Sequence, residues 1–219
     1  MPKLKPDTQR ARRDNILEAA EICFARSGFH ATSMQDICRE AGVSPGALYV
    51  YFSSKEDLIA GLAERNRQEF QARFAQLAEA TDFFAALEGI GQAYFVEDEA
   101  HRRQICLEIG LESTRNATVG EIHRSVDEFV ASNFENLFQR MIDDGRIRPA
   151  HSAAALARVF MIIGDGLFWR SAVDRKFDMA KTIPDVVEVI RQLLNPVEDI
   201  ASRRPGTPLG ESEVGAPQD

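Results

Sequence analysis

The chain has 219 residues, of which 44% are hydrophobic and 27% charged, and its net charge at pH 7 is −8. This composition is typical of a folded globular protein and excludes the fibrous and disordered classes. No apolar run approaches the ~20 residues that span a bilayer, and no apolar segment follows the basic first residues, so we expect neither a membrane partner nor a secretory signal. Three widely spaced cysteines favour a reducing, cytoplasmic location over a disulfide framework or a zinc site.

The charge is uneven along the chain. Residues 1–13 carry five Lys and Arg side chains against one Asp, although the whole chain is acidic. A basic segment ahead of a helix can contact the phosphates of a nucleic acid. It can equally be a solvated terminal tail, because runs of charge are usually solvated. Charge alone leaves both interpretations open.

The first predicted elements are two helices. Apolar residues from Ile16 to Phe24 share one helical face, and Gly28 is placed to end that helix. Ser33 begins a second, short helix, with Asp36 three residues later in a capping-box arrangement. This second helix is expected to stop at Gly42.

Two more helix starts follow at once. Ser44 is a candidate N-cap, with Pro45 in the first helical position. Ser53 stands in capping-box spacing with Glu56 and is expected to begin a long helix that continues to about residue 80.

The rest of the chain is predicted to be helical up to residue 194. Further helices are expected over 82–96, 101–114, 118–144, 150–174 and 182–194, and no segment alternates with the period of a strand. From residue 196 the chain is rich in Pro and poor in large apolar residues, which predicts disorder. The sequence therefore divides into a head (1–54), a helical body (55–195) and a disordered tail (196–219).

A helix-turn-helix is indicated between the second and third helices. Ala41 is small enough to let the two helices approach, Gly42 allows the positive φ of a tight turn, and Ser44 caps the next helix. Val43 would fill the corner between them. Such a motif places its second helix in the major groove of DNA.

The residues that follow make this motif more specific. The string Gly46-Ala47-Leu48-Tyr49-Val50-Tyr51-Phe52, with Lys55 and Leu58, resembles the DNA-binding signature of the tetracycline-repressor (TetR/AcrR) family of transcriptional regulators. The resemblance covers residues 10–60, and Cys38, where the family usually has Ala, is a small hydrophobic substitute. It implies an all-α homodimer in which a three-helix head is joined by a long helix to a ligand-binding and dimerisation body. No cofactor is expected.

The resemblance also implies contacts with a palindromic double-stranded operator. The recognition helix would present small residues to base edges, while hydroxyls and cations would meet phosphates. This helix holds no Arg or Asn for a bidentate base contact, so sequence preference would come from apolar contacts and DNA shape. The expected DNA-binding residues are Arg10, Arg13, Ser33, Ser44, Pro45, Gly46, Ala47, Tyr49, Tyr51 and Lys55.

Two apolar helices near the end of the chain, 150–174 and 183–194, resemble the pair that forms a four-helix bundle with a second subunit in this family. They could also form a core within one chain. The dimer-interface residues expected on this basis are Leu156, Phe160, Ile163, Leu167, Val187, Ile190 and Leu194.

An unidentified small-molecule effector is expected to bind in the body. Aromatic side chains at helical spacing could line its pocket, although such stripes more often form core. Acidic side chains among them could anchor a polar group. The candidate pocket residues are Phe70, Phe74, Tyr94, Glu108, Glu112, Met161, Asp165 and Trp169.

Neither a metal site nor an enzyme is expected. The four His residues lie in separate segments, and no phosphate-binding loop, dinucleotide-binding motif or nucleophile elbow occurs. A helical adaptor that does not bind DNA is the alternative, but it leaves the motif over residues 32–58 unexplained. The sequence therefore predicts a ligand-responsive transcriptional regulator, a repressor that a small molecule releases from its operator.

Overall fold

The computed structural model describes residues 6–97, 100–174 and 176–197. In these ranges all regular elements are helices, and the only strand-like pairing is one antiparallel bridge between Ile147 and Pro196. The predicted all-α fold is confirmed. Val197 N–H donates to the carbonyl oxygen of Arg146 (2.9 Å), so the body continues to Val197 instead of ending at residue 195. The remainder of the predicted tail, residues 198–219, lies outside the described residues.

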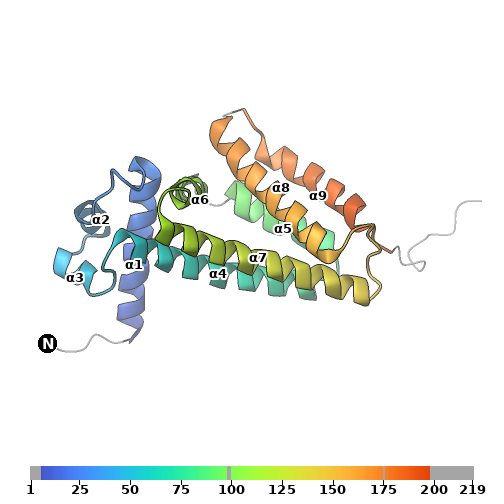
Figure 1. Cartoon of the computed structure of the whole chain (residues 1–219), viewed down its shortest axis with the longest axis horizontal. Helices are drawn as coiled ribbons and strands as arrows, with labels where there is room; N and C mark the ends of the chain where they lie inside the picture. The colour runs from blue at the N-terminus through green and yellow to red at the C-terminus, as the bar shows by residue number, and fades with distance from the viewer. Residues whose placement is uncertain (1–5, 98–99, 175, 198–219) are drawn as a thin grey trace, which may run out of the picture.

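The head stands at one end of an elongated molecule, with the body extending away from it (Figure 1). Helices α4 and α7 run side by side along the body and contact each other, while α8 packs against both α7 and α9. The helices are α1 (Pro6–Ser27), α2 (Met34–Ala41), α3 (Pro45–Tyr49), α4 (Lys55–Glu79), α5 (Phe83–Gln92), α6 (Ala100–Ser113), α7 (Ala117–Asp143), α8 (Ala153–Val173) and α9 (Met179–Leu194), and a π-helical turn, η1 (Ala93–Glu97), follows α5.

Head and body have separate hydrophobic cores. The head core joins the apolar faces of α1 and α2 to Leu48, Phe52 and the first two turns of α4. It does not stop at residue 54, because Leu62 of α4 and two body residues, Ile105 of α6 and Val119 of α7, are buried in it. The body core is built from α4, α5, α7, α8 and α9.

Two predicted helix starts are corrected. Helix α1 begins at Pro6, well before the apolar periodicity that starts near Asp14, so the basic residues from Arg10 onward lie within a helix and not in an arm ahead of it. Helix α4 is capped by Ser54, whose hydroxyl accepts from Asp57 N–H (3.1 Å). Ser53 instead donates both its backbone N–H and its hydroxyl to the Asp57 carboxylate.

Helix α9 begins at Met179, before the expected start at residue 182, and Pro184 therefore lies inside the helix. Asp178 is the N-cap, and its carboxylate accepts from Lys181 N–H (3.2 Å). Proline has no N–H to donate to the carbonyl four residues before it, which is that of Ala180. Gln92 of α5 donates its side-chain amide to this oxygen (3.1 Å), so the helix continues through the proline without an unsatisfied acceptor.

Candidate functional site

The helix-turn-helix is held by the local interactions that its sequence predicts. Ser33 and Asp36 form the capping box at the start of α2, and the hydroxyl of Ser44 accepts from Ala47 N–H (3.2 Å) at the start of α3. Gly42 ends α2 with φ +64°, in the left-handed region. Asn15 of α1 donates to the carbonyl of Ala41 (2.8 Å), which fixes the turn against the first helix.

One face of α3 is open to solvent. Leu48 and Phe52 are buried in the head core, whereas 54% of Tyr49 and 79% of Val50 are exposed. Pro45 and Gly46 are exposed at the first turn, and a Cβ on Gly46 would meet no atom within 4 Å. A short helix with small residues at its first turn and uncovered side chains beyond can approach the floor of a DNA groove.

The other predicted contacts on the turn and on α3 are less exposed. Ala47 and Tyr51 are half-buried, and Tyr51 packs partly on the head core. The hydroxyls of Ser33 and Ser44 already serve as helix caps, and that of Ser33 also donates to Asp36 (2.6 Å). A phosphate would have to share these hydroxyls with the backbone.

The three predicted cationic contacts have different surroundings. Arg10 is exposed on α1. The guanidinium carbon of Arg13 lies 5.2 Å from the centre of the Phe52 ring, so Arg13 covers the residue where the chain leaves the helix-turn-helix. Lys55 donates to the carbonyl of Phe29, and its Nζ lies 4.2 Å from the centre of the Phe29 ring. Lys55 therefore joins α4 to the α1–α2 loop, a structural role that its sequence position does not reveal.

A cavity of about 560 Å³ lies in the body, enclosed by helices α4 to α9. Of the predicted pocket residues, Phe70, Phe74, Tyr94, Met161, Asp165 and Trp169 line it. Most of the remaining lining is aromatic or aliphatic and includes Phe95, Val126, Phe134, Phe168 and Ile183.

The assignment of Glu108 and Glu112 to this pocket is wrong. Both lie on the side of α6 that faces the head. Glu108 accepts from Phe29 N–H (2.7 Å), and the buried carboxylate of Glu112 pairs with His30 Nε2 (2.9 Å) and Arg115 Nε (3.1 Å). Helical periodicity shows that the two glutamates share a face with each other but not which neighbour that face meets.

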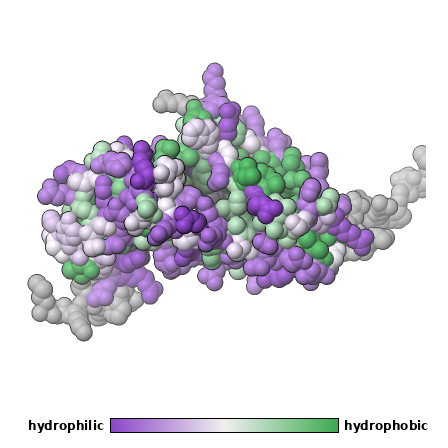
Figure 2. Space-filling model, viewed as in Figure 1, coloured by the Kyte–Doolittle hydropathy of each residue, from purple (hydrophilic) through white to green (hydrophobic). Residues whose placement is uncertain are grey.

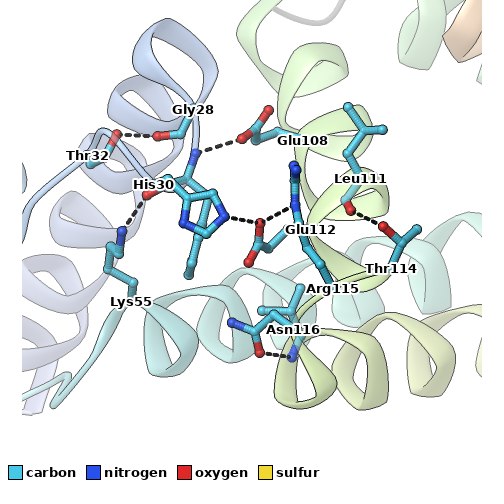
Figure 3. A network of polar contacts seen from close by, with 12 residues as sticks. Gly28, His30, Thr32, Lys55, Glu108, Leu111, Glu112, Thr114, Arg115 and Asn116 are labelled. Carbon is cyan, nitrogen blue, oxygen red and sulfur yellow. Dashed lines mark hydrogen bonds and ion pairs between the residues drawn. The ribbon is translucent and has the colours of Figure 1, made fainter.

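Figure 3 shows these contacts as one network between head and body. The α1–α2 loop is bound from two directions: Lys55 of α4 holds the carbonyl of Phe29, while Glu108 and Glu112 of α6 hold Phe29 N–H and the His30 ring. Asn116, at the start of α7, donates to Glu56 of α4 (3.1 Å). The orientation of the head is therefore set by helices that also enclose the cavity.

Polar side chains line the cavity from α4, as Asn66 and Arg73, and from α7 and α8, as His123, Asp127 and Asp165. His123 Nδ1 lies 3.1 Å from Asp127 Oδ2, and this hydrogen bond raises the pKa of His123 despite the burial of the ring. Burial raises the pKa of Asp165, the nearby Asp127 adds to the effect, and His123 partly opposes it.

The residues predicted to form the dimer interface do not form a surface of this chain, so that prediction is wrong. Leu156 and Leu194 are buried in the body core, and the other five, Phe160, Ile163, Leu167, Val187 and Ile190, line the cavity. The most apolar face of each helix packs inside its own chain. A second apolar stripe on α8 remains uncovered and comprises Val159, Ile162, Trp169 and Val173. Hydrophobic surface gathers over α8 in Figure 2.

Within the described residues no group of three or more His, Cys, Asp or Glu side chains is arranged to hold a metal ion. No helix in the same ranges is long and apolar enough to cross a membrane.

The fold and the exposed α3 define a helix-turn-helix regulator with a cavity in its body. The model of the bacterial regulatory proteins of the tetR family matches residues 16–62, which are the head and the start of α4. UidR of Escherichia coli (strain K12), an HTH-type transcriptional regulator, is 31% identical over 160 residues, which are 71% of this chain and 79% of UidR. The chain therefore belongs to the tetR family and is a DNA-binding transcriptional regulator.

Solved structures agree with this assignment. GusR from Salmonella enterica has a TM-score of 0.70 at 28% identity, and the match covers 84% of this chain and 95% of GusR. FadR from Bacillus subtilis, solved in complex with stearoyl-CoA, has a TM-score of 0.67 at 20% identity and covers 81% of this chain and 96% of FadR. The likeness to FadR extends to the fold alone.

Proposed function

We propose that this regulator is a cytoplasmic homodimeric repressor that binds a palindromic operator and leaves it when a small molecule occupies the cavity. It acts by binding and not by catalysis. The observation that carries the proposal is that α6 lines the cavity with one face and holds the head with the other. A ligand that changes the position of α6 can thereby change the position of the recognition helix.

The DNA contacts of the proposal begin with the first turn of α3. Pro45, Gly46 and Ala47 would meet base edges, because small residues let the backbone approach the groove and their carbons suit thymine methyl groups. The exposed Tyr49 hydroxyl and the Arg10 guanidinium would contact phosphates, which fix the register of the protein on the duplex.

The homodimer is supported by the uncovered stripe on α8. Val159, Ile162, Trp169 and Val173 are spaced by three, seven and four positions, which places them along one side of the helix. Ile162 is 69% exposed and Trp169 54%, which is unusual for apolar side chains that meet only water. Two copies related by a two-fold axis would cover this stripe and present two recognition helices to two half-sites.

Coupling between cavity and head is supported by the two faces of α6. Cys106, Leu107 and Gly110 line the cavity, whereas Glu108 and Glu112 hold the α1–α2 loop. An effector with higher affinity for one position of α6 would shift the equilibrium between two head orientations by that difference in affinity. Release follows when the favoured orientation no longer matches the half-site spacing.

The test is operator binding by two matched glycine variants. Gly46→Glu and Gly89→Glu introduce the same side chain at helical glycines where an added Cβ meets nothing within 4 Å. We expect Gly46→Glu to reduce affinity for the DNA upstream of its own reading frame at least tenfold in fluorescence anisotropy, because it places a carboxylate against the groove. Gly89→Glu, on α5 of the body, should bind like wild type. Equal binding by both variants would show that α3 does not enter the groove.

A further inference from the structure

We propose that the effector is an apolar molecule that carries an aromatic ring and one protonated amine, with the ring inside the cavity and the amine at Asp165. This inference rests on the proposed function, in which the cavity is the effector site, and it names the chemistry of the ligand.

The interior of the cavity selects for a ring. Tyr94, Phe95 and Phe168 form a contiguous aromatic wall, with ring centres 5.6 Å apart for Tyr94–Phe168 and 5.0 Å apart for Phe95–Phe168. Phe70 continues this wall, with its ring centre 5.7 Å from that of Tyr94. Edge-to-face and tilted arrangements of this kind also accommodate an additional ring, which gains both burial and quadrupole contacts.

The opening of the cavity lies where α6, α7 and α8 meet. Three lining residues are exposed in the single chain: Leu111 of α6, and Asp165 and Trp169 of α8. Trp169 belongs to the α8 stripe that the proposed dimer covers, so Leu111 and Asp165 mark the opening. His123 and Asp127 line the cavity from α7. A ligand whose ring lies among the aromatic side chains would therefore have its other end beside these polar groups.

The charge at this opening is negative. Asp127 is paired with His123, so these two groups balance each other when the imidazole is protonated. The carboxylate of Asp165 forms no hydrogen bond or ion pair with any residue in the described ranges. Although water reaches it, the surrounding protein removes enough hydration to raise its pKa. A cation that donates to Asp165 would replace the lost hydration, and a carboxylate ligand would be repelled.

A cation, Arg73 of α4, also lines the cavity. The guanidinium of Arg73 lies 3.8 Å from Glu69 Oε2 and 4.2 Å from the centre of the Tyr94 ring. Glu69 also accepts from Arg102 Nη2 (3.1 Å), so it is shared between two guanidinium groups. A ligand anion at Arg73 would have to compete with this carboxylate and with the aromatic face.

The experiment uses three probes that share one ring and chain: 4-phenylbutylamine, 4-phenylbutanol and 4-phenylbutanoate. Trp169 is the single tryptophan of the chain and lines the cavity, so its fluorescence reports binding directly. The matched variants are Asp165→Asn and, as control, Glu128→Gln, which removes an exposed charge from α7 outside the cavity lining. Operator affinity is measured in parallel by anisotropy with and without each probe.

We expect the amine to bind about tenfold more tightly than the alcohol and the carboxylate to bind most weakly, as for one charge-assisted hydrogen bond. Asp165→Asn should abolish the preference for the amine and leave the alcohol unchanged, while Glu128→Gln should behave as wild type. The inference is overturned if the carboxylate binds as tightly as the amine, or if Asp165→Asn keeps the preference. If the alcohol or carboxylate alone releases the operator, the ligand class is wrong and the proposed function stands. If no probe binds, the ligand class is wrong, and the Gly46→Glu comparison still tests the proposed function by itself.

Discussion

The contact between head and body can be tested at Gly61, on the second turn of α4. A Cβ built on this glycine lies 2.8 Å from Leu17 Cδ2 and 2.9 Å from Phe52 Cε1. Both neighbours are buried in the head core, at 0% and 4% exposure, so neither can move into solvent. Gly61→Ala should therefore force α4 away from Leu17 of α1 and from Phe52, which follows α3.

The magnitude follows from comparing two alanines. Replacing Gly by Ala in a helix interior stabilises by about 1 kcal/mol, and Gly89→Ala on α5, where an added Cβ meets nothing within 4 Å, should show that gain alone. Overpacking a filled core costs about 1–3 kcal/mol. The free energy of unfolding of Gly61→Ala should thus lie about 1–3 kcal/mol below that of Gly89→Ala, and its Tm roughly 2–12 °C lower.

Urea unfolding at one fixed protomer concentration measures this difference, because the stability of a dimer depends on concentration. Operator affinity should fall for Gly61→Ala and remain unchanged for Gly89→Ala, since Phe52 lies three residues after the end of the recognition helix α3. If Gly61→Ala is as stable as Gly89→Ala and binds DNA equally well, the head does not pack on α4 as described.

Further predictions concern the recognition helix, the dimer, the junction and acid stability. Tyr49→Phe should weaken operator binding by about 1 kcal/mol in anisotropy at unchanged Tm; equal affinity would show that its hydroxyl makes no contact. Ile162→Asp should give monomers in analytical ultracentrifugation, whereas a retained dimer would place the interface elsewhere. Glu112→Gln should lower the free energy of unfolding by about 1–2 kcal/mol in urea, because His30 and Arg115 lose a charged acceptor. Hydrogen bonds from Ser33 and Ser53 lower the pKa of Asp36 and Asp57. Their contribution is therefore complete above the ordinary pKa of about 3.9 and lost as the pH falls through the lowered values. The advantage of wild type over Asp36→Asn/Asp57→Asn in stability should be full at pH 6 and shrink as the pH falls below about 3.9; a constant gap would contradict this.

The head was predictable because its determinants are local. Ser33 with Asp36, Gly42 and Ser44 each act within a few residues, so their pattern gives the helix ends and the turn directly. The start of α1 at Pro6 was not predictable, because no apolar side chain marks the first turns of this helix. At α4 two adjacent serines offered the same signal, and only the structure shows that Ser54 is the cap.

What the sequence could not show about the pocket, the dimer and the junction depends on contacts between distant segments. Glu108 and Lys55 are 79 and 26 positions from Phe29, which both of them bind, and no periodicity in either helix indicates that partner. The dimer prediction selected the more apolar side of α8, but that side lines the cavity of its own chain. When both sides of a helix are apolar, composition alone does not show which is internal. The proline in α9 was tolerated because of Gln92, a residue 88 positions from the carbonyl that it satisfies.

The burial of Ile105 and Val119 in the head core bears on how regulators of this shape can be recombined. A DNA-binding unit that ends after α4 would lack these two side chains, so the part of the head core that they fill would be exposed to water. The body of another regulator, fused to this unit, would have to supply side chains of matching size from its own α6 and α7. Chimeras that exchange operator specificity should therefore carry α6 from Ile105 onward and the first turn of α7 along with the head. The unit of exchange is discontinuous in sequence, although the DNA-reading surface is a single short segment.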